Sequence, residues 1–202
     1  LVRHFPSSYS VDRTEGANPI RQELNNLNEA GQMYGAIIYN KAPIMMQQLE
    51  MLLGEEAFQE GVKEYLNTFA NRNATWPELI AILDKRTDQD LKLWSEVWVN
   101  TPGRPVFDLV YDRDENNRYA VKLHQSDPEG KNRTWPQTFA VARFDGEGGE
   151  LLKMLDSEAD VSPYFKRDDS GEDYQGLLNA DGKGYGLFQI AQVATLSQWN
   201  KL

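Results

Sequence analysis

Tyr39 is the residue whose type and position most readily suggest chemistry. It stands directly before residues 42–53, whose apolar side chains recur at the spacing of one helix face. These side chains are Ala42, Met45, Met46, Leu49, Leu52 and Leu53. Pro43 fits only the first turn of a helix, and Gly54 is typical of a helix end. The helix is therefore predicted to begin at 40–43, with Tyr39 at its N-terminal end. A hydroxyl beside the positive end of a helix favours an oxyanion, although from spacing alone a tyrosine that packs structurally is the commoner case.

The other chemical groups are few. The two histidines, His4 and His124, have no second nitrogen or sulfur ligand near them in sequence, and no H-E-x-x-H, G-x-S-x-G or phosphate-loop motif occurs. Residues 181–184 (Asp-Gly-Lys-Gly) lack the spaced acidic ligands of a calcium loop, so a hairpin turn is favoured. Trp94 and Trp98 could form an aromatic platform for a ligand, but they extend an apolar helical stripe and are expected in the core.

Composition limits the class of protein. The chain has 202 residues, 40% hydrophobic and 26% charged, which is typical of a soluble protein with one large or two small domains. A net charge of −10 argues against nucleic-acid or anionic-membrane partners, and no apolar stretch is long enough to span a membrane. The lack of cysteine excludes disulfides and thiolate metal sites and leaves cytoplasm and periplasm both open. Because the chain begins at Leu1 rather than Met, we expect it to be a piece of a longer protein.

Helical periodicity dominates the first half of the chain. Proline, serine and glycine interrupt any period in residues 1–30, which are expected to be irregular. Three amphipathic helices are predicted after the one at 42–53: residues 55–69, a helix opened by the capping box of Thr75 and Glu78, and a helix opened by Thr87 and Asp90.

The second half has the period of strands. Two prolines and a glycine in residues 101–105 end the helical part. Strands are predicted at 106–112, 119–125, 138–144, 151–155 and within 177–190. Residues 156–173 are expected to form an acidic loop, and residues 191–199 to be helical again. Several short strands with regular turns predict an antiparallel β-sandwich.

Three stretches occur in the order of one known family's motifs. They are residues 18–20 (Asn-Pro-Ile), 38–42 (Ile-Tyr-Asn-Lys-Ala) and 53–58 (Leu-Gly-Glu-Glu-Ala-Phe), the last followed by Gly61, Tyr65 and Leu66. Further along stand Trp94, Trp98, Pro102 and Gly103, and then residues 179–185 (Asn-Ala-Asp-Gly-Lys-Gly-Tyr). Together these stretches resemble the aminopeptidase N-like zinc metallopeptidases, the gluzincin aminopeptidases that include leukotriene hydrolase.

The resemblance implies an α+β fold with several domains. Residues 1–103 would be the α-helical C-terminal half of a thermolysin-like catalytic domain, residues 104–190 an antiparallel β-sandwich, and residues 191–202 the start of a further helical region. Asn18 stands where the family usually has His, and Ala42 where it usually has Gly. The family's H-E-x-x-H motif and third Glu ligand would precede Leu1. The parent protein is therefore expected to bind zinc, and this chain by itself to bind none.

The resemblance also implies a role for Tyr39, which matches the family's catalytic tyrosine. In the parent, an aminopeptidase that removes N-terminal residues from peptides, its hydroxyl would stabilise the tetrahedral oxyanion formed when activated water attacks the peptide carbonyl. Lys41 matches a lysine of the family, but it receives no chemical role. The chain alone is expected to be inactive.

Two other classes of function stay open at this point. The parent could be a catalytically dead scaffold that retains the peptidase fold for protein contacts. Alternatively, the chain could be a binding module whose sandwich carries the ligand site. An exposed aromatic patch would support the module, and burial of Trp135, Tyr111 and Tyr119 would count against it.

Overall fold

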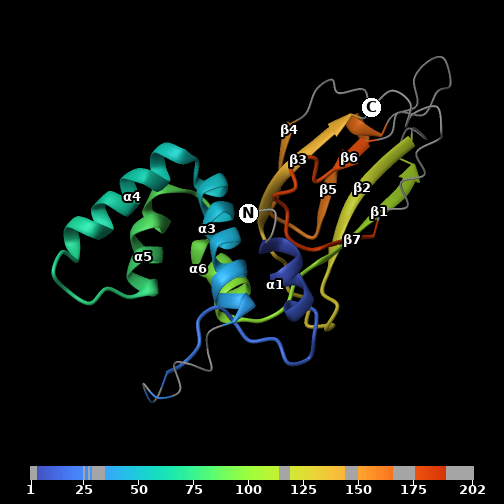
Figure 1. Ribbon diagram of the computed structural model, residues 1–202. Helices are drawn as coiled ribbons and strands as arrows, with labels where there is room; N and C mark the ends of the chain where they lie inside the picture. Colours follow the sequence, from blue (N-terminus) through green and yellow to red (C-terminus); the bar gives the residue numbers. More distant parts are fainter. Residues whose placement is uncertain are drawn as a thin grey trace. The chain divides into compact units, whose positions relative to one another are not determined.

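The computed structural model describes residues 4–24, 26, 28, 35–113, 119–143, 150–165 and 176–189. Within these residues the chain contains five α-helices and two β-sheets, so the predicted α+β class is confirmed (Figure 1). The chain divides into two compact units, Leu1–Arg104 and Pro105–Leu202, the first helical and the second built of strands. Among the described helices, none has the length and apolar character needed to cross a membrane. The helix predicted at 191–199 lies outside the described residues.

The first unit consists of helical turns. Its α-helices are α1 (His4–Asp12), α3 (Ala42–Leu53), α4 (Glu55–Thr68), α5 (Trp76–Leu83) and α6 (Leu91–Ser95). Two π-helical turns, η2 (Ile37–Lys41) and η4 (Glu96–Asn100), precede α3 and follow α6, and a 3-10 turn, η3 (Asp84–Arg86), follows α5. The four helices predicted from periodicity and capping residues are therefore confirmed.

Local capping signals set where these helices begin. The backbone N–H of Thr75 donates to Glu78 Oε2 at 2.7 Å, which completes the predicted capping box of α5. Asp90 Oδ1 accepts from the backbone N–H of Leu93 at 2.9 Å and caps α6 in the same manner. Trp94 is fully buried, as is Trp98, so the prediction that they belong to the core is confirmed.

The helices α3 and α4 pack through faces that are only partly apolar. The buried residues of α3 are Ile44, Met45, Gln48, Leu49 and Leu52, so half of the predicted stripe is buried. Gly54 ends α3 with a φ of 89°, a conformation that L side chains rarely adopt. A Cβ on Gly61 would lie 2.4 Å from Leu83 Cδ2, so only glycine permits α4 to approach α5 this closely.

The prediction that residues 1–30 are irregular is wrong at His4–Asp12, which form α1. Pro6 lies in the first turn, where a missing N–H breaks no hydrogen bond. The side chain of Ser8 donates to the carbonyl of His4 at 2.8 Å, and the buried residues of α1 are Ser8 and Asp12. Because its buried face is polar, α1 has no apolar period by which sequence analysis could find it.

The second unit contains two sheets (Figure 1). One sheet has the order β5-β2-β1-β7, with β1 (Val106–Arg113), β2 (Tyr119–Ser126), β5 (Glu158–Asp160) and β7 (Leu187–Gln189). The other has the order β4-β3-β6, with β3 (Gln137–Arg143), β4 (Glu150–Met154) and β6 (Gly176–Leu178). The pairs are antiparallel except β1 and β7, which run parallel, so the prediction of a fully antiparallel arrangement is wrong at that edge.

Both sheets contribute to one apolar core. Alternate residues of the strands point into it, as the period of a half-buried strand requires. Its members are Phe107, Val121, Leu123, Phe139, Val141, Met154, Val161, Phe165 and Leu178. Trp135 is fully buried, which counts against an aromatic ligand patch, while the side chains of Tyr111 and Tyr119 lie outside those described.

Two predictions for the end of this unit are wrong. Residues 156–173 are predicted to be a loop, but the described part, 156–165, includes β5 and a 3-10 turn, η5 (Ser162–Tyr164), and residues 166–173 lie outside the described residues. Glu158 and Asp160 of β5 are exposed while Ala159 packs on the core, so acidic residues occupy the outer face of an edge strand. The turn at 181–184 is not a hairpin, because β6 pairs with β3 and β7 pairs with β1.

The turn between β6 and β7 is held by its own side chains. Asn179 has a φ of 54°, and its Oδ1 accepts from the N–H of Gly184 at 2.7 Å while its Nδ2 donates to the carbonyl of Gly184 at 3.2 Å. Asp181 Oδ1 accepts from the N–H of Ala140 in β3 at 3.0 Å. A Cβ on Gly184 would lie 3.0 Å from Phe139, which explains the glycine at that position.

We expect Asn179→Ala to lower the free energy of unfolding of the second unit by about 1–3 kcal/mol, because two side-chain hydrogen bonds disappear and alanine tolerates a positive φ less well than asparagine. Asn179→Gly removes the same bonds without the backbone strain, so its loss should be smaller. Urea unfolding followed by tryptophan fluorescence measures both. Equal stability of the Ala variant and the wild type would contradict this interpretation of the turn.

Candidate functional site

Tyr39 lies in the middle of η2, and it is 57% exposed. Its backbone N–H donates to the carbonyl of Gly35 at 3.0 Å, and Lys41 after it has helical dihedral angles (φ −69°, ψ −43°). The prediction that α3 begins at 40–43 is confirmed, but the placement of Tyr39 at an open helix mouth is wrong. Tyr39 is accessible because of the side of the helical turn it occupies, and not because it borders a free positive helix end.

Pro43 accounts for the change of helical form at this point. The N–H of Ala42 donates to the carbonyl of Ile37, five residues earlier, as in a π turn. Pro43 follows with no N–H to continue the ladder. π turns are frequent at functional sites, but η4 has the same form and contains the fully buried Trp98, so the form alone does not mark a site.

Lys41 forms a buried ion pair with Asp12 of α1. The distance from Lys41 Nζ to Asp12 Oδ2 is 2.7 Å, and both side chains are 0% exposed. Lys41 Nζ also donates to the carbonyl of Gly103 at 2.9 Å, and Asp12 Oδ1 accepts from the N–H of Gly103 at 3.0 Å. Sequence reasoning gave Lys41 no role and missed Asp12, because their pairing joins segments far apart in the chain.

Asn40 is bonded to α1 at a second place. The ring nitrogen Nδ1 of His4 donates to Asn40 Oδ1 at 2.5 Å, and Asn40 Nδ2 donates to Ser7 Oγ at 3.1 Å. We refer to His4, Ser7 and Asn40 as the Asn40 cluster. Residues 40 and 41, which directly follow Tyr39, are thus both bonded to α1, and Tyr39 projects toward solvent.

Tyr9 is an aromatic residue of α1 that contacts a cation. The guanidinium of Arg104 lies 4.1 Å from the ring centroid of Tyr9. Burial raises the pKa of Tyr9, although the positive charges of Arg104 and Arg13 act in the opposite direction. Tyr9 therefore remains a neutral phenol near neutral pH and serves packing.

Metal ligands are not assembled in the described part of the chain. No group of three or more His, Asp or Glu side chains that could hold a metal ion occurs among the described residues, and the sequence has no cysteine. His4 contacts Asn40, and His124 lies in β2, in the other unit. The described residues therefore do not fit a zinc site.

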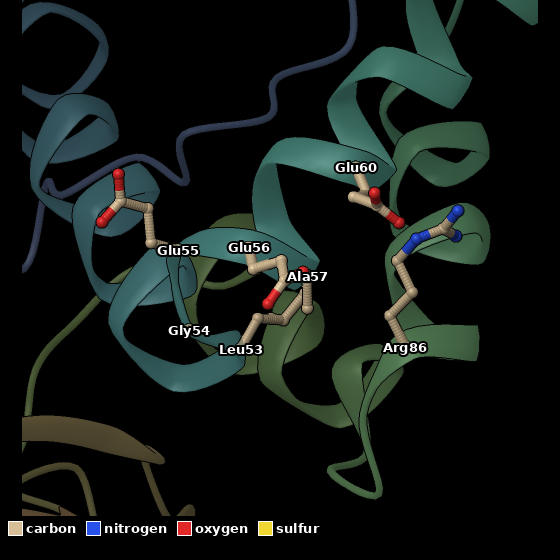
Figure 2. A pocket seen from close by; sticks show the side chains of 7 residues that line it. All are labelled: Leu53, Gly54, Glu55, Glu56, Ala57, Glu60 and Arg86. Atoms are coloured by element: carbon tan, nitrogen blue, oxygen red, sulfur yellow. The ribbon is translucent and has the colours of Figure 1, made fainter.

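A hollow of about 520 Å³ lies at the start of α4, away from η2. Figure 2 shows Glu60 of α4 and Arg86 of η3 pointing toward each other across it. Arg86 is already engaged, because it forms an ion pair with Glu64 and donates to the carbonyl of Ile82 at 2.8 Å. Tyr39 is not among the residues that line the hollow.

The arrangement around Tyr39 suits one chemical task. An exposed phenol on a helical turn that is bonded to a neighbouring helix can donate a hydrogen bond to an oxygen outside the unit. Donors held in place in this way stabilise developing negative charge because they need no rearrangement during the reaction.

Lys41→Met tests the ion pair. The substitution leaves the Asp12 carboxylate buried without its counter-charge, so we expect the free energy of unfolding of the first unit to fall by about 3–5 kcal/mol. Lys122→Met breaks the half-exposed pair with Glu158 (51% and 49% exposed), and its effect on the second unit should stay below about 1 kcal/mol. Chemical denaturation measures both. A loss at Lys41 no larger than that at Lys122 would show that the pair does not hold the unit together.

Comparison with known proteins matches residues 1–98 to the peptidase family M1 domain. The chain is 27% identical over 162 residues to aminopeptidase N of Streptomyces lividans, which covers 76% of the chain and 19% of that protein. For aminopeptidase N of Lactobacillus helveticus the identity is 30% over 160 residues, covering 78% of the chain and 18% of the relative. For aminopeptidase M1-A of Oryza sativa subsp. japonica it is 28% over 187 residues, covering 92% and 21%.

These matches cover both units. The family match extends over most of the helical unit, and the rice relative aligns with nearly the whole chain. The chain spans about a fifth of the length of the curated relatives it matches. With this coverage and the order of its motifs, the chain belongs to the aminopeptidase N-like proteins of peptidase family M1.

Proposed function

We propose that the protein to which this chain belongs is a zinc-dependent aminopeptidase of the gluzincin type, which removes N-terminal residues from peptides. The relatives named above are aminopeptidases, which supports a peptidase with peptide substrates. The observation that carries the proposal is the 57% exposure of Tyr39 on a turn fixed to α1 at two places.

In this proposal Tyr39 stabilises the tetrahedral intermediate. Attack of water on the peptide carbonyl turns its oxygen into an oxyanion, and the Tyr39 hydroxyl donates a hydrogen bond to it. In this role Tyr39 acts as a hydrogen-bond donor. The zinc that such enzymes use to activate water would be bound outside the described residues.

The domain assignment is part of the same proposal. Residues 1–103 correspond to the helical second half of a thermolysin-like peptidase domain, residues 104–190 to a β-sandwich domain, and residues 191–202 to the start of a further helical region. The two sheets with a shared core support the second assignment. The boundary of the two compact units at Arg104 supports the division between the first and the second.

Tyr39→Phe in the full-length protein tests the role of the hydroxyl. Loss of one donor to the oxyanion should lower kcat by roughly 10²–10³ and change KM little, because the bond forms mainly in the transition state. Steady-state kinetics on a peptide substrate, with the zinc content of each preparation, measures the effect. Tyr65→Phe in α4 is the matched control and should keep wild-type kcat. Full turnover in Tyr39→Phe with intact zinc would refute the role.

The 202-residue chain alone provides a second test. Since its described residues do not fit a zinc site, we expect the purified chain to bind no stoichiometric zinc and to release no N-terminal residues. Elemental analysis after dialysis against zinc, and a peptidase assay on the same sample, measure this. One zinc per chain would contradict the proposal that this chain by itself binds no zinc.

A further inference from the structure

The Asn40 cluster stands next to Tyr39, and Asn40 lies within the 38–42 stretch without a role that the resemblance gives it. We infer that Asn40 and His4 are positioning residues: their hydrogen bond fixes η2 against α1 and so fixes the direction of the Tyr39 side chain. This inference rests on the proposed function of Tyr39. Asn40 thereby has a role that the resemblance does not assign to it.

The first argument is the geometry of the contact. Asn40 uses both ends of its amide, because Oδ1 accepts from His4 Nδ1 at 2.5 Å and Nδ2 donates to Ser7 Oγ at 3.1 Å. Two bonds from one planar group fix both the position and the rotation of that group. Asn40 is adjacent to Tyr39 in the chain, so fixing Asn40 restricts the backbone that carries the Tyr39 ring.

The second argument is that the buried ion pair alone does not determine the rotation of the turn. Lys41 is fully buried and pairs with Asp12 at the last residue of α1, so the ion pair fixes η2 to α1 at one point. The short side chain of Asn40 adds a second attachment one residue away. Two attachments at different angles around the helix axis prevent rotation about either one.

The third argument comes from the composition of α1. Its buried residues are Ser8 and Asp12, while the rings of Phe5 and Tyr9 are only half-buried. Its contact with η2 includes polar groups placed at both of its ends, His4 at the first residue and Asp12 at the last. A helix of this composition is suited to orienting a neighbouring turn rather than to forming a core.

The test uses Asn40→Ala and His4→Ala in the full-length protein. Each should lower kcat by roughly tenfold to a hundredfold at nearly constant KM, as expected when a catalytic group is displaced by about an ångström. Asn40→Asp keeps the acceptor for His4 and should restore part of kcat. Ser10→Ala is the matched control in α1, because the hydroxyl of Ser10 donates within its own helix, to Ser7 O at 2.8 Å.

Two measurements distinguish a specific effect on the position of Tyr39 from a general destabilisation of the helical unit. Hydrogen exchange at the amides of residues 37–42 should become roughly tenfold faster in Asn40→Ala and His4→Ala and stay unchanged in Ser10→Ala. Asn40→Ala should also have no further effect on kcat in a Tyr39→Phe background. An equal decrease of kcat in both backgrounds, or unchanged exchange, would overturn the inference.

The same experiment distinguishes failure of this inference from failure of the proposed function. If Tyr39→Phe lowers kcat while Asn40→Ala and His4→Ala do not, the proposed function stands and the positioning role is refuted. If Tyr39→Phe leaves kcat unchanged, the proposed role of Tyr39 is refuted and the positioning role with it, even where exchange is faster.

Discussion

The ion pair between Lys41 and Asp12 is the interaction on which the helical unit depends. Removing two charges from water is costly, and their attraction offsets that cost only when their remaining hydrogen-bonding capacity is also satisfied. Here the backbone of Gly103 supplies both an acceptor for Lys41 and a donor for Asp12. One buried group of charges therefore joins the beginning of the unit, its central helical turn and its last residues.

The strand unit uses polar side chains for the same purpose, and it too contains a largely buried ion pair, between Arg133 and Asp127 (12% and 2% exposed). Its irregular segments are fixed by side-chain groups that bond to main-chain groups: Gln137 exchanges two bonds with the backbone of Tyr185, and Asp181 accepts from the N–H of Ala140. Buried backbone groups need partners, and where no neighbouring strand supplies them a side chain must do so. In both units, the residues that look polar and unremarkable in sequence are the ones that hold the less regular chain in place.

This distribution of forces explains what the sequence could predict. The helix opened by Thr75 and Glu78, and the burial of Trp94 and Trp98, depend on residues three or four positions apart, so a local pattern is sufficient to find them. α1 and β5 could not be found in this way, because a polar helix is held by Asp12 pairing with distant Lys41, and a three-residue strand is held by β2. Similarly, spacing could locate Tyr39 beside a helix, but the bonds of Asn40 to His4 and Ser7 join segments far apart in the chain.

The parallel pairing of β1 with β7 has a consequence for how the second unit is made. β1 is its first strand, and the N–H of Leu187 at the start of β7 donates to the carbonyl of Pro105 at 3.0 Å, just before β1. Contacts between such remote parts of a chain form late, since a long loop must close before they are gained. During synthesis on the ribosome, one edge of β1 must therefore wait until β7 has emerged, and the nascent sheet carries an open edge at which a neighbouring nascent chain can pair.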